Sequence, residues 1–299
     1  MRILICDPIS EKAIEEIKTL GIELTNKPDI TPDGLLDEIA NYDGIIVRSR
    51  TKVRKDVIDR GVNLKFIIRG GVGLDNIDVE YAKSKGIKVL NTPAASSISV
   101  AELAIGFMFA LSRHIVHGTT SMKNGEWLKK KLKGSEIYGK TLGIIGIGRI
   151  GREVAKRGIA LGMKVMAYDP YVDSIDMEGV ELVDMDTLLS SSDFISLHIP
   201  HTEETHHIIG KEAFEKMKDG VYLINCARGG VVDEEALYDY ISSGKVKGAG
   251  FDVFEKEPPE NLKLLELDNF ICTPHIGAST KEGQARVGEE IVKILKGMI

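Results

Sequence analysis

The sequence predicts an α/β chain built on two doubly wound parallel sheets. Short apolar runs alternate with stretches whose apolar residues recur every three or four positions, as strands separated by helices do. The first series has five strand candidates, at 3–6, 22–25, 44–47, 64–68 and 87–90. The second has six, at 141–145, 164–168, 194–198, 221–225, 247–251 and 270–273. Six strands match the size of a full dinucleotide-binding unit.

Two helical stretches lie outside this alternation. One runs from about Ser97 to His117, and its middle, 104–111, is apolar on all sides. This composition predicts burial against more than one neighbour, including a second subunit. The other runs from about Thr280 to Lys296 and is expected to pack on the first unit. We therefore predict one domain at 1–95 plus 280–299 and another at 96–279.

Composition excludes several classes of protein. The 299 residues are 43% apolar and 28% charged, which is ordinary for a globular chain, and the net charge is −6. This charge speaks against nucleic-acid binding, and the lysine-rich run at 129–133 is interpreted as a solvated segment. The three cysteines have no metal-binding spacing, so we expect neither a metal site nor disulfides. With no signal-peptide pattern or membrane-length apolar run, we expect a cytoplasmic protein.

The strongest motif is Gly146-Ile147-Gly148-Arg149-Ile150-Gly151. It follows an apolar strand candidate and opens a helical pattern, which is the context in which G-x-G-x-x-G binds a pyrophosphate. The glycines permit a tight turn, close approach of the phosphates and close helix–strand packing. Asp169 ends the next strand candidate, where a carboxylate can bind ribose hydroxyls and repel a 2′-phosphate. The pattern indicates a Rossmann domain that binds NAD.

Three ionisable residues follow later strand candidates of the second series: Arg228, Glu257 and His275. Ligands of open parallel sheets bind at the carboxyl ends of the strands, so the three side chains are expected at one edge. Histidine can exchange a proton near neutral pH, a carboxylate can favour its charged form, and arginine can bind a substrate carboxylate.

The chain resembles the D-isomer-specific 2-hydroxyacid dehydrogenase family, most closely the members that oxidise 3-phospho-D-glycerate. The matching motifs occur in the expected order at 70–78, 91–93, 100–104, 146–151, 200–202, 225–230, 252–258 and 273–277. The resemblance implies a flavodoxin-like substrate domain beside the Rossmann domain, a homodimer, and Arg228, Glu257 and His275 as catalytic residues. His275 would protonate the developing alkoxide in reduction and act as base in oxidation.

The same resemblance implies further contacts. Besides Gly146, Gly148, Gly151, Asp169, Arg228 and His275, the expected cofactor contacts are Arg149, Ile150, His198, Ile199, Pro200, Thr205, Cys226, Ala227, Asp252, Gly277 and Ala278. The small anionic 2-hydroxy or 2-keto acid would be bound by Arg48, Arg50, Gly71, Val72 and Gly73. In this assignment the glycine turn holds the carboxylate and the arginines hold a phosphate.

Two alternatives stay open at the level of sequence. The same catalytic set would serve a glyoxylate or hydroxypyruvate reductase, whose substrate has no phosphate. An NAD-sensing, corepressor-like binding protein can also keep these residues. The sequence ends at Ile299, soon after the last helical stretch, so we expect no C-terminal regulatory domain and no serine inhibition through one.

Overall fold

The structure, a computed structural model, describes residues 1–260 and 262–299 and divides into two units. Unit 1 comprises Met1–Ser99 and Ala278–Ile299, and unit 2 comprises Val100–Gly277. Each unit has one sheet, and all strand pairings of the described residues are parallel. The predicted fold class is therefore confirmed. The expected domain limits, 95/96 and 279/280, lie a few residues from the limits of these units.

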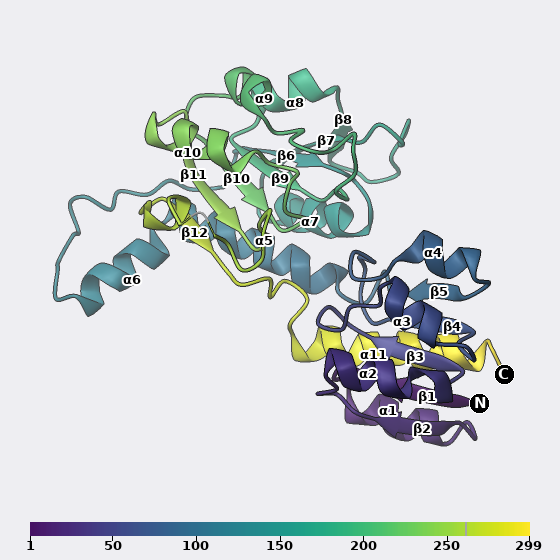
Figure 1. Cartoon of the computed structure of the whole chain (residues 1–299). Coiled ribbons are helices and arrows are strands. Elements are labelled where there is room, and N and C mark those ends of the chain that lie inside the picture. Colours follow the sequence, from purple (N-terminus) through teal and green to yellow (C-terminus); the bar gives the residue numbers. More distant parts are fainter. Residues whose placement is uncertain (261) are drawn as a thin grey trace. The chain divides into compact units, whose positions relative to one another are not determined.

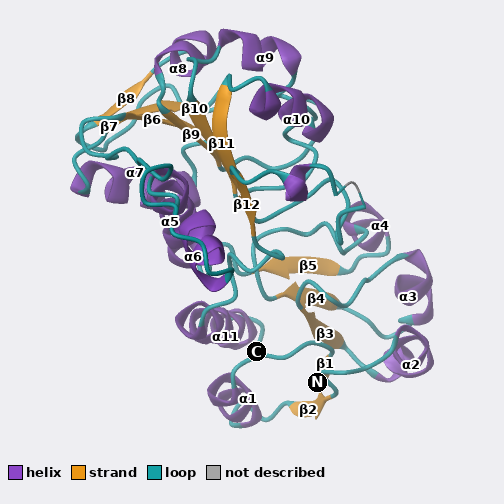
Figure 2. Cartoon of the chain, turned by 90° about the vertical axis from the view of Figure 1, so that its left-hand side faces the viewer, coloured by secondary structure: helices purple, strands orange, loops and turns teal. Residues whose placement is uncertain are grey.

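Unit 1 has a five-stranded sheet in the order β2-β1-β3-β4-β5, which is the flavodoxin-like order. Its strands are β1 (Arg2–Ile5), β2 (Glu23–Asn26), β3 (Gly44–Val47), β4 (Phe66–Arg69) and β5 (Lys88–Asn91). Helices α1 (Glu11–Lys18) and α11 (Lys281–Lys296) cover one face (Figure 2). The other face carries α2 (Pro32–Glu38), the 3-10 turn η1 (Ile39–Asn41), α3 (Lys55–Arg60) and α4 (Val79–Ser84).

Alternation along the strands builds the two cores of unit 1. Successive side chains of a strand point to opposite faces of the sheet. Ile3 and Ile5 therefore pack with α1 and α11, where Ile291 is fully buried. Leu4 lies between them in sequence and packs with α2 and α3 on the other face. Polar residues come at or just after the carboxyl ends of these strands: Asp7 after β1, Arg48 after β3 and Arg69 at the end of β4.

Unit 2 has a seven-stranded sheet in the order β12-β11-β10-β9-β6-β7-β8 (Figure 1). This is the Rossmann order with one further strand. The strands are β6 (Thr141–Ile145), β7 (Lys164–Tyr168), β8 (Val180–Leu182), β9 (Phe194–Leu197), β10 (Val221–Asn225), β11 (Val246–Phe251) and β12 (Phe270–Cys272). One face packs on α5 (Ser97–Ser112) and α7 (Arg149–Ala160). The other packs on α8 (Met185–Ser191), α9 (Lys211–Lys216) and α10 (Glu234–Ser242), and η2 (Leu264–Glu266) precedes β12.

Two details of unit 2 differ from the sequence prediction. The predicted series of six strands lacks β8, which has three residues and forms the edge of the sheet. The predicted helix from Ser97 to His117 is broken: α5 ends at Ser112, and α6 (Ile115–Lys123) continues at an angle of 62°. His114 occupies the break with a φ of +53°, a left-handed conformation that ends a helix.

The apolar middle of α5 is explained by burial inside unit 2. Ala101, Ala104 and Met108 are fully buried and pack with β-strand residues of one sheet face.

Within the described residues no single helix is long and apolar enough to cross a membrane. Helices α5 and α6 together have the length and composition of a span, but they form a pair bent by 62°.

Candidate active site

The glycine-rich turn joins β6 to α7 at the carboxyl end of the unit 2 sheet. Gly146 has a φ of +91°, and a Cβ there would lie 2.6 Å from the carbonyl oxygen of His198. A Cβ at Gly151 would lie 2.1 Å from the carbonyl oxygen of Gly146. Both positions therefore require glycine. The space around Gly148 is open instead, since a Cβ there would meet no described atom within 4 Å beyond the adjoining residues of the chain.

Gly148 also precedes α7 as its N-cap and supplies no side chain to cap it. The first N–H groups of a helix have no partner within the helix, and α7, whose first two residues are Arg149 and Ile150, presents them beside this open space. An uncapped N-terminus next to a glycine turn binds anions through N–H groups and the helix dipole. The turn thus fits a pyrophosphate.

Asp169 follows β7 and lies against the same turn. One of its carboxylate oxygens accepts a hydrogen bond from the Ile147 N–H at 3.0 Å, and the other accepts from the Tyr171 N–H at 3.0 Å. Each oxygen keeps a lone pair that a ribose hydroxyl can use. A negative charge beside the turn disfavours a 2′-phosphate, so the donor set fits NAD better than NADP.

The segment after β9 carries four expected cofactor contacts. His198 binds the Ser196 hydroxyl through Nε2 at 2.8 Å, while its Nδ1 is buried and has no partner among the described residues. Burial lowers the pKa of His198 to about 3, so the ring is neutral. Ile199 packs against Gly146, and Pro200 accepts the Thr205 hydroxyl hydrogen at 2.7 Å. Thr205 thus stabilises its own loop, and its contact with phosphates stays a prediction.

The histidine and glutamate of the predicted catalytic set are in direct contact. His275 Nδ1 lies 2.7 Å from Glu257 Oε2, and the other oxygen, Oε1, accepts from the Phe254 N–H at 3.2 Å. Because Nδ1 is used in this way, Nε2 is the ring nitrogen left for a substrate. Both residues border a largely apolar cavity of about 370 Å³ in unit 2, together with Phe254, Pro258 and Leu265.

The contact sets the charge of both side chains. The hydrogen bond that His275 donates to Glu257 raises the pKa of His275; burial opposes the rise, the Glu257 and Asp252 charges add to it, and Arg228 opposes it. Burial on its own would raise the pKa of Glu257, but His275, the Phe254 N–H and Arg228 together lower it. The pair therefore favours a protonated imidazole beside an ionised carboxylate.

Asp252 fixes the loop that presents His275. The carboxylate is buried and accepts three hydrogen bonds, from the Thr273 hydroxyl at 2.5 Å and from the Ile276 and Gly277 N–H groups at 2.7 Å each. His275 lies within this loop with a φ of +53°, a conformation that needs such support in a non-glycine residue. Asp252 therefore has a positioning role in this structure, and its contact with the cofactor stays a prediction.

Arg228 lies in the turn after β10. Its carbonyl accepts from the Asn225 side chain at 3.0 Å, and the Asn225 side-chain oxygen accepts from the Ala227 N–H at 3.0 Å.

The thiol of Cys226, next to Ala227, is buried. Burial, and to a smaller extent the charge of Asp252, hold the pKa of this thiol well above its ordinary value. Cys226 is therefore no thiolate nucleophile. Gly277 lies beside Asp252, and Ala278 is the first residue of the C-terminal part of unit 1.

The expected substrate contacts all belong to unit 1. The turn after β4 has its carbonyls engaged: Gly71 O accepts from the Thr92 N–H at 3.1 Å, and Val72 O accepts from Asn91 at 2.6 Å. The N–H groups of Val72 and Gly73 have no acceptor among the described residues. A pair of such N–H groups in a glycine turn suits a carboxylate.

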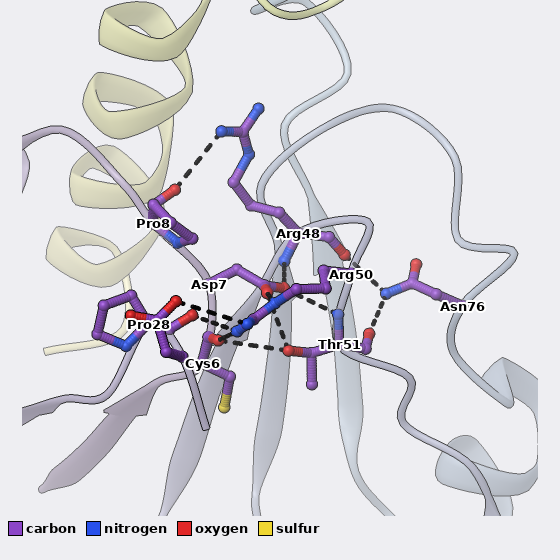
Figure 3. A network of polar contacts seen from close by, with 9 residues as sticks. Cys6, Asp7, Pro8, Pro28, Arg48, Arg50, Thr51 and Asn76 are labelled. Carbon is purple, nitrogen blue, oxygen red and sulfur yellow. Dashed lines mark hydrogen bonds and ion pairs between the residues drawn. The ribbon is translucent and has the colours of Figure 1, made fainter. Parts of the chain in front are cut away.

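The two arginines after β3 differ in their surroundings (Figure 3). Arg50 folds back onto its own unit: Nε donates to Asp7 Oδ1 at 3.0 Å, and Nη2 donates to the carbonyls of Cys6 and Pro28. The Arg48 guanidinium points away from this network, and its Nη1 donates to the Pro8 carbonyl at 3.5 Å. The structure therefore does not present the two guanidinium groups as a matched pair.

Sequence reasoning missed Asp7. It is 1% exposed and accepts from the backbone N–H groups of Arg48 and Thr51 and from the Thr51 hydroxyl, besides Arg50. Asn76 supports the same segment by donating to the carbonyls of Arg48 and Thr51 at 2.7 Å each. The available signal was an acidic residue at the carboxyl end of the first strand, where ligand-binding side chains gather.

Comparison with known proteins places these features in a family. The model of the D-isomer specific 2-hydroxyacid dehydrogenase NAD binding domain matches residues 105–277. A hydroxypyruvate reductase from Thermotoga maritima is 56% identical over 99% of this chain and 97% of its own length. A D-3-phosphoglycerate dehydrogenase from Archaeoglobus fulgidus is 51% identical over 100% of this chain, which spans 58% of the length of that relative.

Among solved structures, a D-lactate dehydrogenase from Aquifex aeolicus in complex with NAD and lactic acid is similar throughout. It has a TM-score of 0.85 and 36% identity, covering 100% of this chain and 95% of the other. The similarity extends over both units, the one with the glycine turn and the one with the arginines.

Proposed function

Because the chain belongs to the D-isomer specific 2-hydroxyacid dehydrogenase family and is an NAD-dependent enzyme, we propose that it oxidises 3-phospho-D-glycerate to 3-phosphohydroxypyruvate, the first step toward serine. The observation that carries the proposed chemistry is the 2.7 Å contact between His275 Nδ1 and Glu257 Oε2. A histidine held by a carboxylate at Nδ1, and lining a cavity, is suited to exchange a proton with a substrate oxygen through its second nitrogen.

The roles of the residues follow from their chemistry. When bound, NAD would accept the hydride that leaves the substrate C2, and NADH would donate it back in the reverse direction. During oxidation His275 Nε2 takes the hydroxyl proton, and during reduction it returns that proton to the carbonyl oxygen. Glu257 stabilises the charged imidazole. Arg228 binds the substrate carboxylate and polarises the carbonyl through its planar set of donors.

The glycine turn, α7 and Asp169 would hold the cofactor, together with the remaining expected contacts. For the substrate, the Val72 and Gly73 N–H groups would bind the carboxylate, and Arg48 would bind the phosphate. Burial lowers the pKa of Arg48, with Asp7 opposing, yet a guanidinium keeps its charge near neutral pH. Names of relatives support this substrate, since several are D-3-phosphoglycerate dehydrogenases.

A second candidate is hydroxypyruvate reduction. It is favoured by the engagement of Arg50 with Asp7, Cys6 and Pro28, which leaves a smaller cationic site than two arginines would make. The Thermotoga maritima relative, similar over nearly its full length, carries that name.

The test is a set of initial rates. NAD reduction would be followed with 3-phosphoglycerate at alkaline pH with product removal, and NADH oxidation with phosphohydroxypyruvate, hydroxypyruvate and glyoxylate. A higher kcat/KM for the phosphorylated pair supports the proposal. Equal or higher values for hydroxypyruvate replace it by the second candidate. Tight NADH binding without turnover of any substrate would indicate the sensor alternative instead.

We also propose a homodimer. Exposed apolar side chains gather on α6 and the segment after it: Ile115, Val116, Met122 and Trp127, the last 75% exposed. Such a group of side chains is typical of a protein interface. Light scattering on the purified protein would give the mass of the assembly.

We also propose a cytoplasmic location, because the three cysteines are free.

A further inference from the structure

The segment 254–257 presents Glu257 to His275, and two consecutive N–H groups hold it. The Phe254 N–H donates to Glu257 Oε1 at 3.2 Å and so fixes the carboxylate directly. The next N–H, of Glu255, donates to Glu234 Oε1 at 2.7 Å, which ties the segment to the start of α10. Gly229 lies against the same segment so closely that a Cβ there would be 1.8 Å from the Phe254 carbonyl oxygen.

The tie between Glu234 and Glu255 is reciprocal. Glu255 Oε1 accepts from the Glu234 N–H at 3.4 Å, so each carboxylate binds the backbone N–H of the other residue. Glu234 is the first residue of α10, where N–H groups are unpaired and negative charge is favoured by the helix dipole. The helix N-terminus therefore lets two carboxylates lie in one small region.

His207 reduces the remaining repulsion. Its Nε2 lies 2.9 Å from Glu255 Oε1, its Nδ1 lies 4.0 Å from Asp233 Oδ2, and its N–H donates to the Gly230 carbonyl at 2.8 Å. Burial raises the pKa of Glu234; the charges of Glu255 and Glu257 add to the rise, and the Glu255 N–H and His207 oppose it. The segments that carry His207, Glu234 and Glu255 thus meet next to the turns that carry Arg228 and Glu257.

We propose that Glu234 and Glu255 are positioning residues for catalysis: by binding each other's backbone N–H they fix the segment that holds Glu257 against His275. The proposal rests on the proposed function in that it concerns the same proton transfer. Neither residue is among the expected substrate or cofactor contacts. Their effect passes through Glu257, so it should alter the charge state of His275 as well as the rate.

The decisive variant is Glu234→Ala, which removes the acceptor of the Glu255 N–H. Glu234→Gln keeps an oxygen at that place and is the conservative rescue. Glu235→Ala is the matched control, because Glu235 is the next acidic residue of the same first turn and its exposed side chain has no hydrogen-bond or ion-pair partner among the described residues. Thermal unfolding of each variant monitors folding.

We expect Glu234→Ala to lower kcat/KM by about tenfold, less than the roughly hundredfold loss that a 1 Å misplacement can cause. The pH at which kcat/KM for keto-acid reduction falls should move down by about half a unit, because a looser Glu257 stabilises the His275 cation less. Glu234→Gln should restore both values, and Glu235→Ala should match wild type.

A titration of the His275 imidazole by NMR reads the same effect without turnover. The positioning role is supported if the pKa of His275 is lower in Glu234→Ala than in wild type and is restored in Glu234→Gln. This result would stand even if no tested acid were a substrate, and then only the proposed function would fail. An unchanged His275 titration together with an unchanged pH profile overturns the proposal, whether the rate stays at the wild-type value or falls with thermal stability.

Discussion

His275 Nδ1 lies 2.7 Å from Glu257 Oε2, and this contact raises the pKa of the imidazole while lowering that of the carboxyl. Reduction of a keto acid needs the protonated imidazole. We therefore expect kcat/KM for reduction to be constant at low pH and to fall as the pH rises through the raised pKa of His275. For oxidation, which needs the neutral ring, the rate should rise across the same range.

Glu257→Gln tests the cause of that shift. Without the carboxylate charge the pKa of His275 should return toward its ordinary value of about 6.5, so the falling limb of the reductive profile should move to lower pH. The maximal kcat/KM should drop by roughly tenfold to hundredfold. A profile that keeps the wild-type limb would mean that another group controls the protonation of His275.

Asp169→Asn tests cofactor choice. The amide keeps one acceptor for the backbone but loses the charge that repels a 2′-phosphate. The ratio of kcat/KM with NAD to that with NADP should fall by about tenfold or more. Asp173→Asn, an exposed change four residues away, is the control. An unchanged ratio in Asp169→Asn would place the source of NAD preference elsewhere.

Arg48 and Arg50 should respond differently to substitution. Arg50→Ala leaves the buried Asp7 carboxylate without its cation, so we expect a loss of about 1–3 kcal/mol in the free energy of unfolding, measured by denaturant titration. Arg48→Ala should leave stability nearly unchanged and raise KM for the phosphorylated substrate. If both substitutions raised KM equally and neither lowered the free energy of unfolding, both arginines would bind the phosphate.

Much of the fold was predictable because its signals are local. The glycine turn, its preceding strand and Asp169 lie within about 30 residues and have a defined chemistry. The strand β8 was missed because three residues at a sheet edge carry too little alternation. The break between α5 and α6 was missed because Arg113 and His114 are not helix-breaking residues.

The details of the site were less predictable because they depend on distant pairs. Arg50 and its partner Asp7 are 43 residues apart, and no local pattern shows that this arginine is already engaged. Glu234 and Glu255 are 21 residues apart and meet only after β11 brings their segments together. The sequence showed that Glu257 and His275 follow strands, but only the structure gives the distance between them.

The role of His275 is tested by comparing wild type with His275→Gln in NADH oxidation with phosphohydroxypyruvate and hydroxypyruvate. The dissociation constant of NADH is measured by fluorescence on both proteins. We expect kcat to fall by about 10²- to 10⁴-fold because the proton donor is lost, whereas the dissociation constant of NADH should change by less than about tenfold because the glycine turn, α7 and Asp169 remain to hold the cofactor. A variant that binds NADH normally and keeps its rate within about tenfold of wild type would contradict His275 as the acid and base of the reaction.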